Sequence, residues 1–125
     1  KAAPAARMGT LAHVEENEAA LAAEDVVKVV VDGAGFALYF SRADIAAGSK
    51  GGPALRHVGV YAFRRDFLIE FASWPPGTLE RAERLEQLRA LERGAKIMVV
   101  TGARAFAGVD TPEQLAALEM RGPAR

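Results

Sequence analysis

A run of six residues, Val26 to Val31, constrains the fold of this chain more than any other feature. Valine fills five of its positions, and β-branched residues favour an extended strand. The next four residues read Asp-Gly-Ala-Gly, and a second apolar run over 36–40 follows at once. Glycines between two strand-like runs are typical of a β-hairpin. The sequence therefore predicts two antiparallel strands joined by a short turn.

Other segments carry strand and helix patterns of their own. The patterns predict strands over 8–14, 55–63 and 96–100, and helices over 15–24, 66–73 and 79–93. In the longest of these helices, Thr78 is the expected N-cap and Gly94 the expected stop. The alternation of strands and helices indicates an α/β or α+β fold, built as a single domain over residues 1–125.

Composition excludes several classes of function. Sixteen basic residues balance sixteen acidic ones, which argues against a nucleic-acid partner because phosphate binding usually leaves a basic footprint. No apolar stretch is long enough to cross a bilayer, so a membrane partner is not expected. The chain has no cysteine, which excludes disulfides and thiolate metal sites and suits a reducing compartment.

Asp110 is the candidate for a metal ligand. It precedes Thr111 and Pro112, which fit an N-cap and the first position of a helix. A carboxylate at this place has a structural interpretation, because the helix dipole favours an acid near its N-terminus. It also has a functional interpretation, because Mg²⁺ takes hard oxygen ligands and is often held by one or two carboxylates. The residues alone leave both interpretations open.

Polar side chains gather on one face of the long helix predicted before Gly94. At about 3.6 residues per turn, Glu80, Glu83 and Gln87 share this face, and Glu86 lies beside it. Acids in this pattern usually form a solvated surface, and Glu80 has ion-pair spacing to Arg84. The alternative is a polar wall that binds sugar hydroxyls.

Three further candidates follow or lie on predicted strands. His57 and Tyr61 share one side of strand 55–63 by its two-residue period. The imidazole could donate a hydrogen bond to an anionic ligand, and the phenol could add a second polar contact. Arg42 follows a strand at its loop end, and its guanidinium suits a carboxylate. The structural interpretations are a satisfied internal histidine and a surface cation.

Several of these segments, in this order, resemble the carboxy-terminal half of the 3-deoxy-manno-octulosonate cytidylyltransferase family. The motifs that carry the resemblance are Ser41-Arg42-Ala43, Arg56-His57 with Tyr61, Leu85-Glu86-Gln87-Leu88-Arg89 and Gly108-Val109-Asp110-Thr111-Pro112. The resemblance extends over residues 8–120, which is nearly the whole chain.

This resemblance implies a Rossmann-like nucleotidyltransferase fold with a mixed sheet, with the amino-terminal nucleotide-binding half absent. It implies cytidylyl transfer from CTP to the anomeric hydroxyl of 3-deoxy-manno-octulosonate (Kdo), giving CMP-Kdo and pyrophosphate for lipopolysaccharide biosynthesis. It makes Asp110 the catalytic residue that binds Mg²⁺, and it implies a cytoplasmic homodimer. The substrate-binding residues that it implies are Arg42, His57, Tyr61, Glu86 and Gln87.

Two departures from the family pattern keep alternatives open. The loop between Arg42 and His57 is short and has Ala46-Ala47-Gly48-Ser49 in place of a Pro-x-Asp-Arg-Asp stretch. The loop that grips the CTP phosphates and the second metal-binding aspartate are also missing. We therefore expect a sugar-binding and dimer-forming half with little turnover of its own. The alternatives are activation of another acidic sugar, such as a sialic acid, and a non-catalytic module that binds a sugar acid or dimerises.

Overall fold

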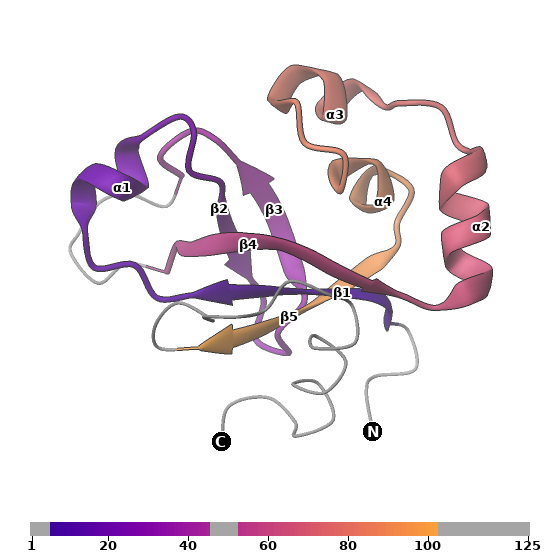
Figure 1. The fold of residues 1–125 in the computed structure, drawn as a ribbon, viewed down its shortest axis with the longest axis horizontal. Coiled ribbons are helices and arrows are strands. Elements are labelled where there is room, and N and C mark those ends of the chain that lie inside the picture. Colours follow the sequence, from indigo (N-terminus) through magenta and orange to yellow (C-terminus); the bar gives the residue numbers. More distant parts are fainter. Residues whose placement is uncertain (1–5, 46–52, 103–125) are drawn as a thin grey trace.

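The computed structural model describes residues 6–45 and 53–102 of the chain (Figure 1). Every strand predicted from the sequence within these ranges is present. The elements in chain order are β1 (Ala6–His13), α1 (Glu18–Ala22), β2 (Lys28–Val31), β3 (Ala37–Ser41), β4 (Leu55–Phe63), α2 (Arg65–Ser73), α3 (Thr78–Glu83), α4 (Leu88–Glu92) and β5 (Lys96–Gly102).

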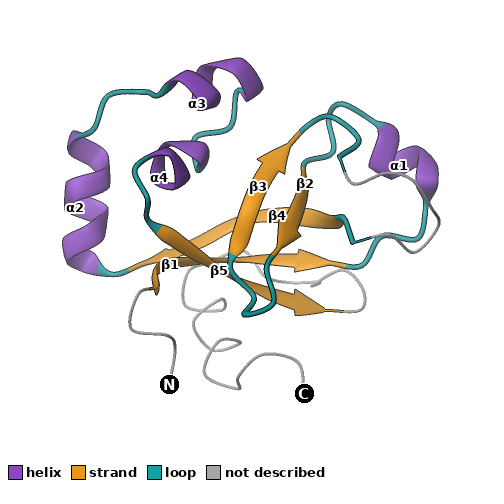
Figure 2. Cartoon of the chain, turned by 180° about the vertical axis from the view of Figure 1, so that it is seen from behind, coloured by secondary structure: helices purple, strands orange, loops and turns teal. Residues whose placement is uncertain are grey.

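The strands form one five-stranded sheet in the order β3-β2-β4-β1-β5. β1 and β5 run parallel, whereas the β1–β4, β2–β3 and β2–β4 pairs are antiparallel. The predicted mixed sheet is therefore confirmed. Both views place α2, α3 and α4 together at one end of the sheet and α1 at the other (Figures 1 and 2).

The predicted hairpin is β2 and β3, and Asp32 shapes its turn. The Asp32 carboxylate accepts hydrogen bonds from the backbone N–H groups of Ala34 (2.8 Å) and Phe36 (2.9 Å). Gly35 has φ +91°, a left-handed conformation that glycine adopts without steric cost. The Gly35 carbonyl accepts a hydrogen bond from the N–H of Val99, so the turn is also fastened to β5.

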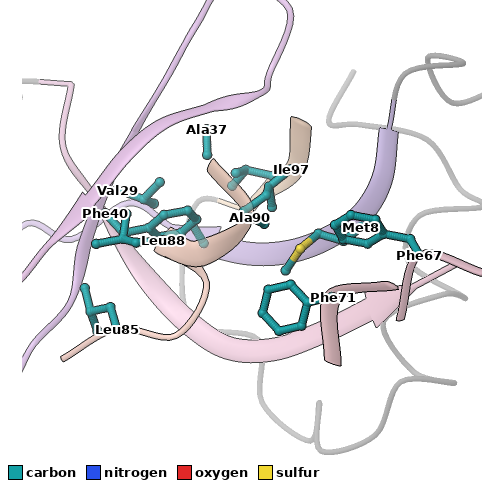
Figure 3. Close-up of a cluster of buried hydrophobic side chains, with 12 residues drawn as sticks. Met8, Val29, Ala37, Phe40, Phe67, Phe71, Leu85, Leu88, Ala90 and Ile97 are labelled. Atoms are coloured by element: carbon teal, nitrogen blue, oxygen red, sulfur yellow. The ribbon is translucent and has the colours of Figure 1, made fainter. Parts of the chain in front are cut away.

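One face of the sheet carries the main hydrophobic core, which α2 and α4 cover (Figure 3). Phe67 and Phe71 of α2 pack around Met8 of β1, while Leu88 of α4 lies against the β2–β3 hairpin at Phe40. A smaller cluster on β1, β4 and β5 centres on the buried Leu11 and Val100. The helices thus bury the apolar side chains that the strands present on one face.

The prediction of one long helix over 79–93 is wrong, because the structure has two short helices there. α3 begins after Gly77 rather than after Thr78, and Arg84 ends it with φ 58°, in the left-handed region. The N–H of Leu85 bonds to the Glu80 carbonyl, and the chain re-enters a helix at Leu88. Neither glycine nor proline marks this break, so the sequence pattern predicted a continuous helix across it.

Leu88 provides the test of this core. Its side chain is fully buried, so Leu88→Ala should lower the free energy of unfolding by about 2–5 kcal/mol through lost burial and a residual cavity. Leu68→Ala on α2 is the matched control, because Leu68 is 46% exposed and its truncation should change stability by no more than about 0.5 kcal/mol. Urea unfolding of both variants measures the difference, and equal losses would contradict this packing.

Candidate functional site

A pocket of about 340 Å³ lies where the loop before β2, the strand β4 and the turn before α4 meet. Its lining combines apolar walls with several polar side chains, an arrangement typical of small-molecule sites. The lining residues are Asp25, Val26, Val27, Arg56, His57, Gly59, Tyr61, Leu85 and Gln87.

Three residues predicted from the sequence to bind substrate meet in this pocket. His57 and Tyr61 lie on the same face of β4, and their ring centroids are 5.5 Å apart. Gln87 reaches the pocket from the turn between the two short helices. Gln87 as a whole is only 4% exposed, and among the described residues none hydrogen-bonds its amide. The break at Arg84 therefore separates Gln87 from the face it was expected to share with Glu80 and Glu83.

Burial keeps the imidazole of His57 neutral. Its ring packs edge-on against Phe40, with centroids 4.9 Å apart, and its Nε2 lies 2.8 Å from the hydroxyl of Thr10. Burial lowers the pKa of His57 to about 4, because a desolvated site disfavours the charged form. Near neutral pH the pocket therefore contains an uncharged imidazole.

Tyr61 likewise stays in its neutral form. Burial raises the pKa of its phenol, and the negative charge of Glu86 raises it further. The hydroxyl can therefore both donate and accept a hydrogen bond throughout the neutral range.

Glu83 holds the end of α3 to the edge of the sheet. Its carboxylate accepts hydrogen bonds from the hydroxyls of Ser41 (2.8 Å) and Tyr39 (3.1 Å) and from the backbone N–H of Arg42 (3.2 Å). Burial by itself would raise the pKa of Glu83, but these hydrogen bonds outweigh it and the pKa is lowered. The acid is therefore a structural anchor and not part of a sugar-binding wall.

The guanidinium of Arg42 bonds to backbone carbonyls. Nε donates to the carbonyl of Glu83 (3.0 Å), Nη2 to that of Arg84 (3.3 Å) and Nη1 to that of Glu24 (3.4 Å). Arg42 does not line the pocket. In this structure it closes the left-handed turn at Arg84, and its role toward a sugar carboxylate stays a prediction.

Glu80 pairs with Arg89, and the predicted pairing with Arg84 is wrong. Two parallel bonds join the side chains, from Nε to Oε1 (2.8 Å) and from Nη2 to Oε2 (2.7 Å). The hydrogen bond from Arg89 lowers the pKa of Glu80. The side chain of Glu86 is 71% exposed, lies 3.5 Å from Arg89 and does not line the pocket. Its role toward substrate also stays a prediction.

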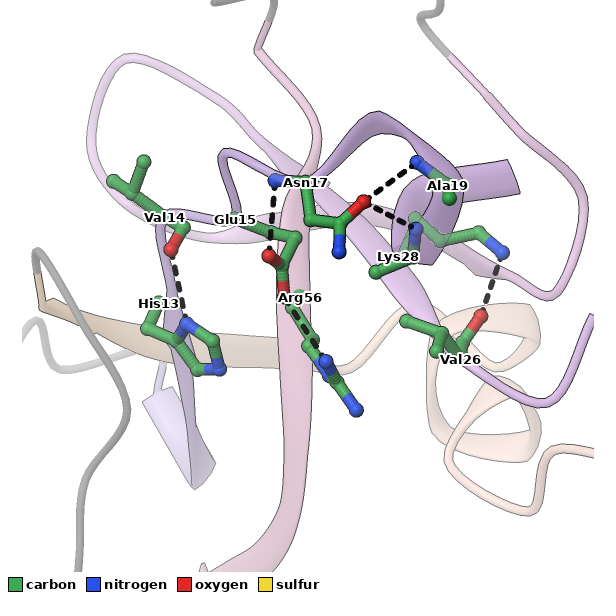
Figure 4. Close-up of polar contacts among 9 residues, drawn as sticks. His13, Val14, Glu15, Asn17, Ala19, Val26, Lys28 and Arg56 are labelled. Carbon is green, nitrogen blue, oxygen red and sulfur yellow. Dashed lines mark hydrogen bonds and ion pairs between the residues drawn. The ribbon is translucent and has the colours of Figure 1, made fainter. Parts of the chain in front are cut away.

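One residue of the pocket lining, Arg56, was not predicted to bind substrate. It pairs with Glu15 at 3.0 Å (Figure 4). The fully buried Lys28, which also had no predicted role, donates from Nζ to the carbonyls of Ala23 (2.8 Å), Val26 (2.6 Å) and Arg42. Burial lowers the pKa of Lys28. This lysine fixes the 23–26 loop beside the pocket, and only the folded backbone brings its three partners together.

The predicted metal ligand Asp110 lies outside the described residues. Within the ranges that the structure describes, no group of three or more His, Cys, Asp or Glu side chains is arranged to hold a metal ion. The metal site therefore stays a prediction from the sequence. In the same ranges, no helix has the length and apolar character needed to cross a membrane.

Glu83 allows a direct test of the anchoring network. Glu83→Ala leaves two hydroxyls and a backbone N–H without their acceptor and should cost about 1–3 kcal/mol of unfolding free energy. Glu86→Ala is the neighbouring control and should stay within about 0.5 kcal/mol, because its side chain is 71% exposed. A Glu83→Ala variant as stable as Glu86→Ala would contradict the anchoring role.

The lowered pKa of His57 predicts how stability depends on pH. As pH falls from about 8 to about 5, the unfolded chain protonates this histidine near its usual pKa of about 6.5, whereas the folded chain keeps it neutral. Protons then favour the unfolded state, so the free energy of unfolding should fall by about 2 kcal/mol over this window. His57→Gln should remove that part of the pH dependence. An identical pH profile in wild type and variant, from denaturant unfolding, would show that His57 is not buried as described.

A sequence model of the family described as Cytidylyltransferase matches residues 1–97. The 3-deoxy-manno-octulosonate cytidylyltransferase of Solibacter usitatus is 49% identical over 115 residues, covering 90% of this chain and 46% of that protein. The enzyme of the same name from Anaeromyxobacter sp. is 54% identical over 111 residues, covering 86% of this chain and 45% of that protein.

A solved structure shows the same similarity in three dimensions. It is titled as CMP:2-keto-3-deoxy-manno-octonic acid synthetase complexed with CTP, and it matches with a TM-score of 0.75 and 39% identity over 94% of this chain and 49% of that one. This match confirms the predicted nucleotidyltransferase fold. The chain spans about half the length of the relatives it matches. Because the family's sequence model covers more than half of its residues, the chain belongs to the cytidylyltransferase family.

Proposed function

We propose that this chain forms the sugar-acid-binding part of an enzyme that transfers a cytidylyl group from CTP to Kdo. The observation that carries this proposal is the pocket in which His57, Tyr61 and Gln87 meet. These three residues come from two sequence motifs some 25 positions apart that resemble the Kdo-contacting motifs of the family. The names of the relatives support the reaction that we propose, and the pocket is the proposed site for the sugar.

The pocket suits a polyhydroxylated ligand. The Gln87 amide can donate and accept hydrogen bonds, and the neutral phenol of Tyr61 can do the same. The volume of about 340 Å³ lies in the range of small-molecule sites. Leu85, Val26 and Val27 add apolar walls. Polar groups held in such a site discriminate strongly, because a ligand without the matching hydroxyl leaves them unpaired.

A sugar acid also needs a partner for its carboxylate, and we propose Arg56 for this role. Arg56 is among the lining residues and its side chain is 42% exposed, so the guanidinium is accessible to a ligand while it remains paired with Glu15. Arg42 and Glu86 were predicted to contact the sugar from the motifs alone. Their contribution is proposed on that basis only, since neither lines the pocket in this structure.

In the proposed reaction, the anomeric hydroxyl oxygen of Kdo attacks the α-phosphorus of CTP. A new bond forms between this oxygen and the α-phosphorus, and the hydroxyl proton is lost to solvent. The bond from the α-phosphorus to the bridging oxygen breaks, and pyrophosphate leaves. This chain's pocket residues bind the sugar and orient its hydroxyl, which lowers the entropic part of the barrier. Mg²⁺, when bound, would neutralise charge on the phosphates. Asp110 is the proposed ligand, and a homodimer working in the cytoplasm is the proposed setting.

Calorimetric titration with Kdo tests the proposal. Binding is the readout because the chain spans about half the length of its relatives. Wild type should bind Kdo, and Gln87→Met, which keeps the length of the side chain but removes the amide, should weaken binding about tenfold. Glu16→Ala is the control, because Glu16 is exposed and outside the pocket.

The same titration separates this proposal from its alternatives. Tighter binding of a sialic acid than of Kdo would point to another acidic sugar as the substrate. Equal affinity of wild type and Gln87→Met for Kdo would contradict the assignment of the pocket.

A further inference from the structure

An irregularity in the β1–β4 pairing places a buried hydroxyl beside His57. Thr10 pairs with Tyr61, but the next residue, Leu11, pairs with Val58, so Gly59 and Val60 are extra residues on β4. Thr10 is fully buried at this irregularity. Its hydroxyl lies within hydrogen-bonding distance of the carbonyls of Val60 (2.8 Å) and Val58 (3.1 Å). The bulge thus gives the Thr10 hydroxyl two acceptors from the β4 backbone.

The same hydroxyl oxygen lies 2.8 Å from Nε2 of His57. A threonine hydroxyl has one proton, and a carbonyl can only accept a hydrogen bond. If Thr10 donates to a backbone carbonyl, its oxygen can only accept from His57, and Nε2 must carry the hydrogen. If Thr10 instead donated to Nε2, no proton would lie between its oxygen and the carbonyl oxygen of Val60. These two oxygens would then repel each other at 2.8 Å.

In a neutral imidazole, a hydrogen on Nε2 leaves Nδ1 as a bare acceptor. Among the described residues none hydrogen-bonds Nδ1 of His57. Every buried side-chain nitrogen or oxygen in the described part of the chain has a partner, so Nδ1 is not sealed in the core. The ring lines the pocket together with Asp25, Arg56 and Tyr61. Nδ1 is therefore available to a ligand.

We infer that Thr10 is a positioning residue that fixes the tautomer of His57 and makes Nδ1 a hydrogen-bond acceptor for a ligand hydroxyl. This inference rests on the proposed function, since it names how that pocket recognises its sugar acid. It reverses the role expected from the sequence, in which His57 donated to the anionic group. The ligand must present a hydroxyl donor to His57, and the carboxylate must bind elsewhere in the pocket.

Nitrogen NMR of the histidine rings tests the inference in the free protein at neutral pH. Wild type should show His57 with hydrogen on Nε2 only. Thr10→Val, which keeps the side-chain shape but removes the hydroxyl, should lose this single tautomer, and Thr10→Ser should retain it. A wild-type spectrum with hydrogen on Nδ1, or an unchanged tautomer in Thr10→Val, would overturn the inference.

Kdo titration of the same variants gives the functional readout. Thr10→Val should weaken binding about tenfold, whereas Thr10→Ser should stay within about twofold of wild type. Weaker binding by Thr10→Ser with an unchanged spectrum would also overturn the inference, because it would show a merely structural effect. Failure of wild type to bind Kdo would defeat the proposed function and the ligand assignment with it, and the ring spectrum would still decide the Thr10–His57 bond separately.

Discussion

The carboxylate of Glu83 joins the helical segment 78–92 to the edge of the sheet, and the position of the pocket depends on that junction. It receives hydrogen bonds from Tyr39, Ser41 and the backbone of Arg42, while the Arg42 side chain binds the carbonyls of Glu83 and Arg84 in return. These reciprocal contacts hold the chain in its left-handed turn. The turn directs the following residues, Leu85 and Gln87, over β4 and into the wall of the pocket.

A second set of buried polar contacts shapes the opposite wall. Lys28 donates hydrogen bonds to three backbone carbonyls, in the 23–26 loop and just after β3. The N–H of His57 bonds to the carbonyl of Val27. A buried ammonium is costly unless its hydrogen bonds are satisfied, and here all three protons have acceptors. Both walls are therefore held by networks that lose several bonds when one member is removed, which favours a preformed site.

Strands and the hairpin could be predicted from the sequence because their signals are local. The valines of β2, the turn at Asp32 and the two-residue period of β4 each lie within a few residues of one another. That period also placed His57 and Tyr61 on one face, as observed. The break at Arg84 gave no such signal, because a non-glycine residue adopts the left-handed conformation there and is held by a distant arginine.

The parts of the site that escaped prediction depend on contacts between distant segments. Thr10 reaches His57 only because the β1–β4 register shifts beside it, and no pattern within β1 reports that shift. Arg56 was predicted only as part of a strand, yet it is one of the residues that line the pocket. The guanidinium of Arg42 is suited to bind a carboxylate, but in the folded chain it donates its hydrogen bonds to backbone carbonyls. Residue type thus indicated what each group could do, and the fold decided which partner it met.

The proposed function requires a sugar acid to bind between β4 and the turn before α4. A crystal structure of the protein with Kdo bound is its most direct test. We expect the sugar in the pocket, with Gln87 and Tyr61 hydrogen-bonded to it and a sugar hydroxyl pointing at Nδ1 of His57. Kdo bound at any other place, with this pocket empty, would contradict it.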